Sequence, residues 1–189
     1  MKLVISLLLL SVSSVPAQEL LLDDFRDPSG VSAMGTRWEA FTDRVMGGRS
    51  DMQAGIMQID GAPALRMSGD VSLENNGGFI QVRLPLATSG YFDGRSYTGV
   101  ALEVRGSAGS YYIHLRDAGT RLPWAYFRQS LPVDDSWRVV RLPFEQFETD
   151  NVLVRSSRAV ELRRLRSLAV VAAGEAFAAD LQVRSLSLY

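Results

Sequence analysis

Two glycine-containing segments gather residues that could bind a ligand. They are FTDRVMGGRSDM (Phe41–Met52) and ENNGGFIQVR (Glu74–Arg83). Paired glycines let the backbone adopt positive φ and approach another surface closely. An aspartate can accept hydrogen bonds from turn amides, and an arginine offers a planar donor fork. Two interpretations stay open: tight turns that serve the fold alone, or turns that present Arg44 and Ser50 to a partner. The candidate partner-binding residues are Asp43, Arg44, Met46, Gly47, Gly48, Ser50, Asn76, Gly77, Gly78 and Phe79.

A second candidate surface surrounds His114, the single histidine of the chain. Side chains two positions apart on a strand share a face, so His114 would line one surface with its neighbours at 112 and 116. Aromatic rings there could stack on sugar rings beside hydrogen-bonding groups. Packing in the core is the alternative for these aromatics, and a strand histidine without function is the alternative for His114. The sugar-binding candidates are Tyr112, His114, Arg116, Trp124 and Tyr126, with Arg128 and Trp137 as further candidates.

Catalytic chemistry finds little support in the residue types. Without cysteine, and with one histidine, the chain cannot form a Cys-His nucleophile pair or a histidine-rich metal site. The GxSxG motif of a serine nucleophile is missing. A glycosidase would need two facing carboxylates, and no local pattern favours any pair among Glu74, Glu103, Glu145 and Glu148. We therefore expect a non-catalytic protein, with a small glycosidase as the remaining enzyme alternative.

Calcium is the one metal that the acidic residues suggest. LLDDFRD places Asp23, Asp24 and Asp27 at the start of the domain, and Asp180 precedes the last predicted strand. The first and last strands of a sandwich are often neighbours, so these oxygens could meet around a hard cation. Their spacing is not that of a defined calcium loop, which favours solvated turn acids instead. We expect no cofactor, with a structural calcium at Asp23, Asp24 and Asp180 as the alternative.

Composition indicates one globular domain without a strongly charged partner. The 189 residues are 47% hydrophobic and 22% charged, and the formal net charge of -1 gives no reason to expect nucleic acid binding. Lys2, the apolar run Leu3–Val15, and the small residues Val15 and Ala17 around Pro16 resemble a signal peptide. We therefore predict a signal peptide over 1–17 and a single domain over 18–189. The protein would be exported, periplasmic or secreted, with no membrane span after cleavage.

Short alternating segments between turn residues predict an antiparallel β-sandwich. GVALEVRG (Gly99–Gly106) and SYYIHLRD (Ser110–Asp117) are predicted to form a hairpin, and SLAVVAAG (Ser167–Gly174) to be a central strand. LQVRSLSLY (Leu181–Tyr189) slips out of alternation between Val183 and Leu186, which suggests a bulge. Helical spacing occurs at Ser156–Arg166 alone, for one or two turns. Further strands are predicted in QAGIMQIDG, APALRMSGDVSL, GGFIQVRLPL, AYFRQSL and WRVVRLPF.

DRVMGGRS, preceded by Trp38 and followed by ENNGGFIQVR, resembles the complex I intermediate-associated protein 30 family. SYTGVALEVRG, SYYIHLRD, SWRVVRLPFEQF and FAADLQVRSLSLY resemble further family segments in the same order, from Asp23 to Tyr189. The resemblance implies a galactose-binding-like jelly-roll β-sandwich. It also implies a non-catalytic role, because the mitochondrial members are assembly factors of respiratory complex I. Two departures stand out: the export-type N-terminus, and GSAGS (Gly106–Ser110) where the family tends to have an acidic turn.

The leading hypothesis is a non-catalytic exported domain that binds a protein partner and helps to assemble or stabilise an envelope complex. The alternative is a domain resembling a carbohydrate-binding module. An exposed apolar patch around Met46 and Phe79 would favour a protein partner. A row of exposed aromatics on one sheet face would favour sugar, and two carboxyl groups facing each other across a cleft would favour a glycosidase.

Overall fold

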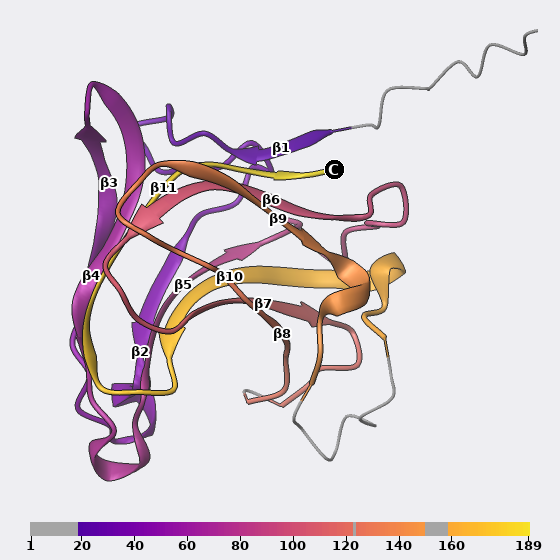
Figure 1. Cartoon of the computed structure of the whole chain (residues 1–189). Helices are drawn as coiled ribbons and strands as arrows, with labels where there is room; N and C mark the ends of the chain where they lie inside the picture. Colours follow the sequence, from indigo (N-terminus) through magenta and orange to yellow (C-terminus); the bar gives the residue numbers. More distant parts are fainter. Residues whose placement is uncertain (1–18, 123, 150–158) are drawn as a thin grey trace, which may run out of the picture.

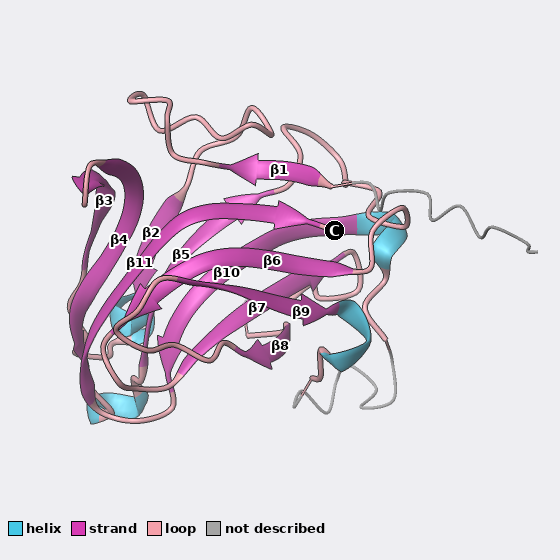
Figure 2. Cartoon of the chain, turned by 45° about the horizontal axis from the view of Figure 1, so that its top comes forward, coloured by secondary structure: helices cyan, strands magenta, loops and turns pink. Residues whose placement is uncertain are grey.

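The computed structural model of the chain describes residues 19–122, 124–149 and 159–189. The predicted signal peptide, residues 1–17, lies outside these residues. The described strands form two antiparallel sheets that stack as a sandwich (Figures 1 and 2). In Figure 1, strands β6, β9 and β11 of one sheet lie above strands β10, β7 and β8 of the other.

The six-stranded sheet has the order β3-β4-β11-β6-β9, and β1 also pairs with β11. The pairing of the first strand with the last, expected for a sandwich, is therefore confirmed. The ladder of β11 with β6 shifts register between Val183 and Ser185, which confirms the predicted bulge. The strands are β1 (Leu20–Asp23), β3 (Gln53–Ile59), β4 (Ala62–Val71), β6 (Gly99–Gly106), β9 (Arg138–Pro143) and β11 (Phe177–Leu188).

The five-stranded sheet has the order β2-β5-β10-β7-β8. Strand β10 lies in the middle of this sheet, as its continuous apolar run predicted. The two strands that flank β10 alternate in burial: every second residue of β5 and of β7 is buried. The strands are β2 (Glu39–Thr42), β5 (Phe79–Pro85), β7 (Tyr111–Asp117), β8 (Phe127–Ser130) and β10 (Leu165–Ala173).

The core lies between the sheets and consists of the inward members of the alternating strands. Because period-2 alternation sends successive side chains to opposite faces, one face of each alternating strand packs inward and the other points away from the core. The inward residues of three strands are almost fully buried: Ile80, Val82, Leu84, Val100, Leu102, Val104, Ile113 and Leu115.

Two local predictions need correction. Strands β6 and β7 do not form a hairpin, because β6 belongs to the six-stranded sheet and β7 to the five-stranded one. Both strands have an apolar face, and burial is satisfied by facing each other across the core as well as by lying side by side. The segment predicted to hold one or two helical turns contains one short 3-10 helix, η4 (Leu162–Arg164), with residues 156–158 outside the described part, but it is not the sole helical segment as predicted.

The other helices of the described residues are also short 3-10 turns at the ends of strands (Figure 2). They are η1 (Asp43–Met46), η2 (Glu74–Asn76) and η3 (Phe144–Gln146). Helices η1 and η2 contain parts of the two glycine segments, between β2 and β3 and between β4 and β5. No helix in the described residues has the length and apolarity needed to cross a membrane.

Candidate functional site

The two glycine segments meet around one buried carboxylate. Asp43 is 0% exposed. Its Oδ1 accepts the Ser50 backbone N–H at 3.0 Å, and its Oδ2 accepts the Ser50 hydroxyl. Oδ2 also accepts the backbone N–H groups of Gly78 at 2.6 Å and Phe79 at 3.3 Å. Asp43 thus ties the β2–β3 loop to the β4–β5 loop, and we call this arrangement the Asp43 knot.

The electrostatics of the knot favour the ionised carboxylate. Burial alone would raise the pKa of Asp43, but the hydrogen bonds from Ser50, Gly78 and Phe79 together hold it below its usual value. Each bond to a charged acceptor is stronger than a neutral one. The carboxylate is fully engaged inside the protein, so it does not contact a partner directly.

Two of the glycines are required by the carboxylate and a third by its backbone angle. A Cβ on Gly48 would lie 2.4 Å from Asp43 Cγ, and one on Gly77 would lie 2.5 Å from Asp43 Oδ2. Gly47 has φ of +90°, a left-handed conformation that favours glycine, and a Cβ there would meet no atom within 4 Å. Of the two interpretations left open by the sequence, these contacts support the structural one for Asp43 and its glycines.

Other residues of the segments also turn inward or back on the loop. Ser50 is buried, and its hydroxyl accepts the Ser72 N–H at 2.9 Å. The Nε of Arg44 donates to the Ser50 carbonyl at 2.9 Å. Asn75, rather than the predicted Asn76, links the loops by donating to the Gly47 carbonyl at 3.4 Å. The side chain of Arg44 is therefore held along its own loop.

Apolar side chains stand exposed on the loops of the knot. Met46 is 57% exposed, Val45 71% and Leu73 52%. Phe79, which was expected to share this surface, is half-buried on β5. Sequence reasoning named Met46 but missed Val45 and Leu73. Both could have been found, because each is an apolar residue close to one of the glycine turns. We call Val45, Met46 and Leu73 the apolar tip.

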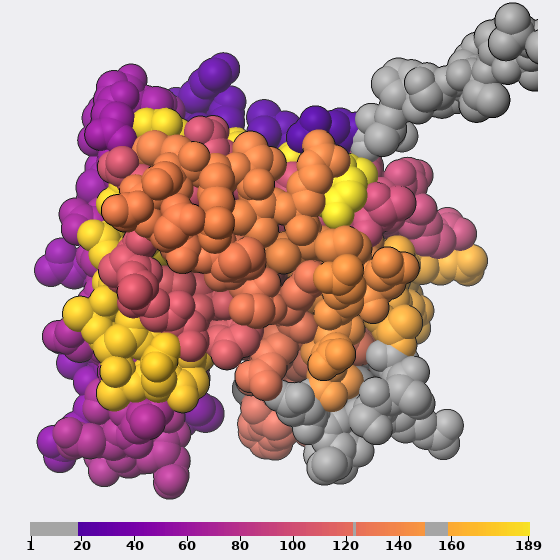
Figure 3. All heavy atoms as spheres, in the orientation of Figure 1, coloured from indigo at the N-terminus to yellow at the C-terminus, as the bar shows by residue number. Residues whose placement is uncertain are grey.

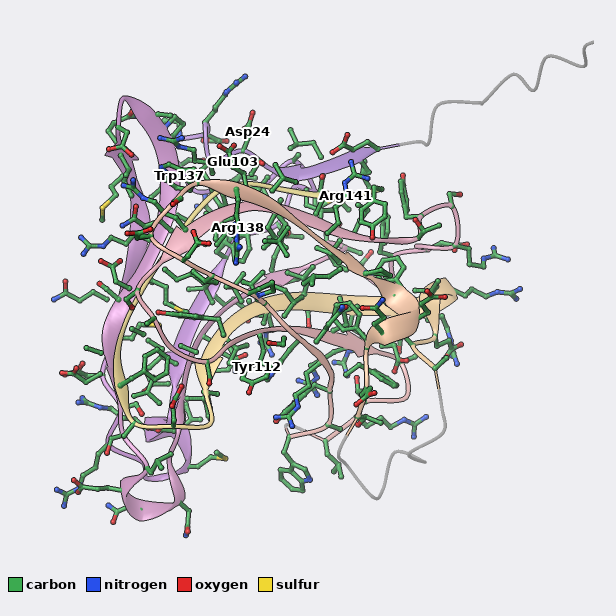
Figure 4. All side chains as sticks on the ribbon, in the orientation of Figure 1. Asp24, Glu103, Tyr112, Trp137, Arg138 and Arg141 are labelled. Atoms are coloured by element: carbon green, nitrogen blue, oxygen red, sulfur yellow. The ribbon has the colours of Figure 1, made fainter. Side chains whose placement is uncertain are left out.

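The second candidate surface is the face of the five-stranded sheet that points away from the core. His114 and Arg83 are both opposite Ala169 of β10, and Arg128 of β8 is opposite His114. Residues directly opposite in an antiparallel ladder share a face. Tyr112 lies two positions from His114 and shares it. Figure 4 shows Tyr112 on the side of β7 turned away from the six-stranded sheet.

The structure brings most of the predicted sugar-binding residues together on this outer face. Tyr112, His114 and Arg116 alternate along β7, and the Tyr126 ring stacks on His114 with centroids 3.9 Å apart and an interplanar angle of 10°. Trp124 is exposed in the connection between β7 and β8. Sequence reasoning missed Phe41, Arg83 and Arg166 here, although the alternation of GGFIQVRLPL was signal enough to place Arg83 on this face.

His114 itself is held neutral. Burial lowers its pKa to about 3, with a smaller contribution from the nearby charge of Arg128. The imidazole stacks on the Tyr126 ring, and the Tyr112 ring is tilted to it with centroids 6.4 Å apart. A neutral, stacked imidazole can donate or accept a hydrogen bond but adds no charge to this face.

Trp137 lies elsewhere, on the outer side of the six-stranded sheet. Its ring is covered by the guanidinium groups of Arg105 at 4.8 Å and Arg184 at 3.9 Å, and its Nε1 donates to Asp60 at 3.1 Å. In Figure 4, Trp137 and Glu103 lie with this sheet, away from Tyr112. Trp137 therefore does not belong to the outer face of the five-stranded sheet.

The acidic candidates are not gathered into one site. Asp23 binds Trp38 Nε1 at 2.7 Å, whereas Asp180 forms two hydrogen bonds with Arg66 at 2.8 and 2.7 Å. Asp23 pairs with Leu186, six positions from Asp180 on β11, which is a separation of about 20 Å. Asp24 pairs with the exposed Arg26 at 3.2 Å. In the described ranges, no three His, Cys, Asp or Glu side chains are placed to hold a metal ion.

The glutamates considered for glycoside hydrolysis come from different elements. Glu74, on η2, pairs with Arg49 at 3.2 Å, and Glu103, on β6, pairs with Arg184 at 3.6 Å. Glu145 lies on η3, and the backbone of Glu148 forms a β-bridge with Arg128 at the edge of the five-stranded sheet. These placements give no support to a catalytic carboxylate pair.

The fold is a two-sheet β-sandwich of the kind seen in carbohydrate-binding modules. The family 11 module of the cellulosomal cellulase Lic26A-Cel5E of Clostridium thermocellum superposes with a TM-score of 0.70 at 14% identity, over 92% of this chain and 95% of the module. The family 30 module of cellulase Cel9D-Cel44B of the same organism superposes with a TM-score of 0.63 at 12% identity, over 91% and 97%. At such low identity these likenesses show the jelly-roll fold alone.

The sequence itself places the chain in a family. The model of the complex I intermediate-associated protein 30 (CIA30) family matches residues 24–183, so the chain belongs to this family. No curated protein matches the chain in sequence. The resemblance carried by DRVMGGRS and ENNGGFIQVR is thereby confirmed at the level of the family.

Proposed function

We propose that this chain is a non-catalytic domain that binds a protein partner through the apolar tip, in the assembly or stabilisation of a larger complex. The observation that carries the proposal is the exposure of Val45, Met46 and Leu73 on loops held by the buried Asp43 knot. A rigid support lowers the entropy lost when such side chains become ordered in an interface. Membership in a family named for association with complex I intermediates supports a protein as the ligand.

The chemistry of the partner surface follows from the tip. Exposed apolar side chains flanked by Arg49 and Glu74, which pair with each other at 3.2 Å, suit an apolar patch with a polar rim. The partner proposed here is therefore a protein with an exposed apolar surface, not a nucleic acid. Because Asp43 is buried and its carboxylate is bound within the protein, substitutions of Asp43 would test the fold and not the interface.

A crosslinking pull-down from native membranes and envelope extract tests this proposal. The tagged domain is compared with the triple variant Val45→Ser/Met46→Ser/Leu73→Ser. The matched control is Met57→Ser/Val139→Ser, which removes exposed apolar side chains from β3 and β9 of the six-stranded sheet. We expect one protein at near-stoichiometric yield with wild type and control, and its loss with the folded triple variant. Equal recovery with all three proteins would contradict an interface at the tip.

Export is part of the same proposal. The apolar run Leu3–Val15 and the small residues before Gln18 support cleavage after Ala17 and a periplasmic or secreted domain. N-terminal sequencing of the protein purified from its native cells, together with cell fractionation, tests this. A mature protein that starts at Gln18 in the periplasm or medium is expected, and a full-length protein in the cytoplasm would contradict export.

A second candidate function is carbohydrate binding on the outer face of the five-stranded sheet. The observation that favours it is the gathering of Tyr112, His114, Arg116 and Tyr126 on this face. One structural neighbour, the family 11 module, has been solved in complex with a β-1,3-1,4-mixed-linked tetrasaccharide, at a TM-score of 0.66 and 13% identity. Isothermal titration with soluble oligosaccharides tests this candidate, and the absence of binding to neutral and acidic oligosaccharides alike would contradict it.

A further inference from the structure

Arginines, rather than bare aromatic rings, dominate the outer face of the five-stranded sheet. Arg83, on β5, and Arg128, on β8, lie in the same cross-strand row through Ala169 and His114. The row spans about 15 Å, because it crosses three strand spacings of about 4.8 Å. Arg116 lies two positions along β7 from His114, on the same face.

Arg166 adds a further cation next to this row. It lies on β10, between Leu165 and Ser167, where the ladder with β7 shifts register, and it is exposed. Burial lowers the pKa of Arg116, and the charges of Arg166 and Arg83 lower it further, which places these two guanidinium groups within electrostatic reach of Arg116. The protein as a whole has a net charge of -1, so this concentration of arginines is local.

Two arginines of this face have no carboxylate partner among the described residues. Glu39 pairs with Arg83, whereas the contact of Glu148 with Arg128 at the edge of the sheet is a backbone β-bridge. Neither Arg116 nor Arg166 forms an ion pair within the described part of the chain. The Nη2 of Arg116 donates to the carbonyls of Thr120 and Leu122 at 2.9 and 2.7 Å, while its buried Nε has no hydrogen-bond partner in the described part of the chain. An unmatched buried donor of a charged group is costly unless a ligand or water accepts from it.

The aromatic rings of the face are already covered on one side. Arg83 lies over Phe41 at 4.9 Å, Arg128 lies over Tyr112 at 5.2 Å, and His114 stacks on Tyr126. A neutral sugar would have to displace these groups in order to stack on the covered side. A negatively charged ligand would instead meet guanidinium planes that the rings hold in place, which is the geometry suited to bidentate binding of carboxylates.

We propose that the outer face of the five-stranded sheet binds an acidic oligosaccharide, whose carboxylate groups are held by Arg116 and Arg166 with Arg83 and Arg128 flanking them. This proposal deepens the second candidate function and rests on it, and it is independent of the partner proposed for the apolar tip. Figure 3 shows a hollow at the lower edge of the molecule, between the lobe coloured purple and yellow and the lobe coloured salmon.

The test uses isothermal titration of the full mature domain with an oligogalacturonate and with a neutral mixed-linked glucan oligosaccharide. The variant Arg166→Gln removes one exposed charge of the site. The control Arg138→Gln removes one exposed charge from β9 of the other sheet, where Arg138 pairs with Asp134. A third variant, Arg116→Lys, keeps the charge but loses the planar fork.

We expect the oligogalacturonate to bind, and the affinity to fall about fivefold or more with Arg166→Gln and with Arg116→Lys but to be unchanged with Arg138→Gln. Because the interaction is between charges, raising NaCl from 50 to 500 mM should weaken it by a similar factor or more. The backbone amides of Ala169 and Val171, in the middle of the face, should shift in NMR spectra of the complex.

Each other outcome has a definite meaning. Equal loss with Arg166→Gln and Arg138→Gln would overturn the site. Tighter binding of the neutral glucan would overturn the acidic ligand while leaving carbohydrate binding in place. Tighter binding of an acidic peptide than of the oligogalacturonate would overturn the sugar as the ligand class. If neither oligosaccharide binds, both this inference and the carbohydrate candidate fail, and the partner proposal is judged by the pull-down alone.

Discussion

Replacing Asp43 with alanine should destabilise the fold more than any surface substitution. The change removes the acceptor for four hydrogen bonds, three of them from the backbone N–H groups of Ser50, Gly78 and Phe79. Each buried donor left without a partner costs about 1–3 kcal/mol, and water entering the space would recover part of this. We therefore expect Asp43→Ala to lower the free energy of unfolding by about 4 kcal/mol, a large part of the ~5–15 kcal/mol of a domain.

Gly48 allows the same reasoning to be tested by a double-mutant cycle. In the wild type, a Cβ at Gly48 would lie 2.4 Å from both Asp43 Cγ and Asp43 Oδ1, and 2.8 Å from Asp43 Cβ. Overpacking of this kind costs about 1–3 kcal/mol. In the Asp43→Ala background the two closest of these atoms are gone. The cost of Gly48→Ala should therefore be at least about 1 kcal/mol smaller there than in the wild type, a coupling typical of residues in contact.

Gly47 supplies the control for this cycle. A Cβ there would meet nothing within 4 Å, but its φ of +90° strains any other residue by about 1–2 kcal/mol. Gly47→Ala should therefore cost the same amount with or without Asp43. Urea unfolding followed by tryptophan fluorescence gives the free energies. A Gly48→Ala cost that is equal in both backgrounds, or an Asp43→Ala loss below about 1 kcal/mol, would refute the knot as the reason for these residues.

Three further predictions concern stability. The low pKa of His114, about 3 in the fold against about 6.5 when unfolded, means that the unfolded state binds more protons between these values, so stability should fall on acidification. From pH 7 to pH 5 the wild type should lose up to about 2 kcal/mol more than His114→Gln in urea unfolding; parallel losses would contradict this. Trp137→Leu should cost about 1–2 kcal/mol by urea unfolding, because it removes two guanidinium contacts and the hydrogen bond to Asp60; a loss under about 0.3 kcal/mol would argue against these contacts. Tyr111→Phe should lower thermal stability by about 1–2 kcal/mol, since the buried hydroxyl accepts the Asp180 N–H at 3.1 Å; an unchanged melting temperature would show that water replaces it.

The local pattern of apolar and polar residues was enough to predict the strands and which side chains share a face. The alternation of SYYIHLRD placed Tyr112, His114 and Arg116 on one face, and the apolar run of SLAVVAAG placed β10 in the centre of its sheet. These features depend on residues within a few positions of each other. The partner of each strand was harder, because β6 and β7 are close in sequence but belong to different sheets. The sheet to which each strand belongs depends on packing across the core, and the sequence of a single segment does not contain this information.

The role of the glycine segments could not be read from either segment alone. Gly77 and Gly78 belong to one loop and Asp43 to another, and the bond from Gly78 to Asp43 joins residues 35 positions apart. From the sequence, Asp43 was a candidate contact for a partner. In the structure its carboxylate accepts hydrogen bonds from two loops and holds them together. Two exposed apolar residues lie beside it, Val45 and Leu73. The sequence does not distinguish them from buried apolar residues, because only the fold shows that their side chains are exposed to solvent.

The position of the knot also constrains how either binding surface can be tested. Asp43 follows β2 directly, and Gly78 directly precedes β5, so the knot clamps one end of the β2–β5 ladder at the pair Thr42 and Ile80. That ladder holds Arg83 at its other end, while the apolar tip projects from the knot's own loops. Loosening the knot would therefore disturb the apolar tip and the arginine face together. A loss of binding in such a variant would not show which of the two surfaces binds the ligand. Substitutions that leave the knot intact, at Leu73 for the tip and at Arg166 for the face, are the ones that can separate a protein ligand from an acidic oligosaccharide.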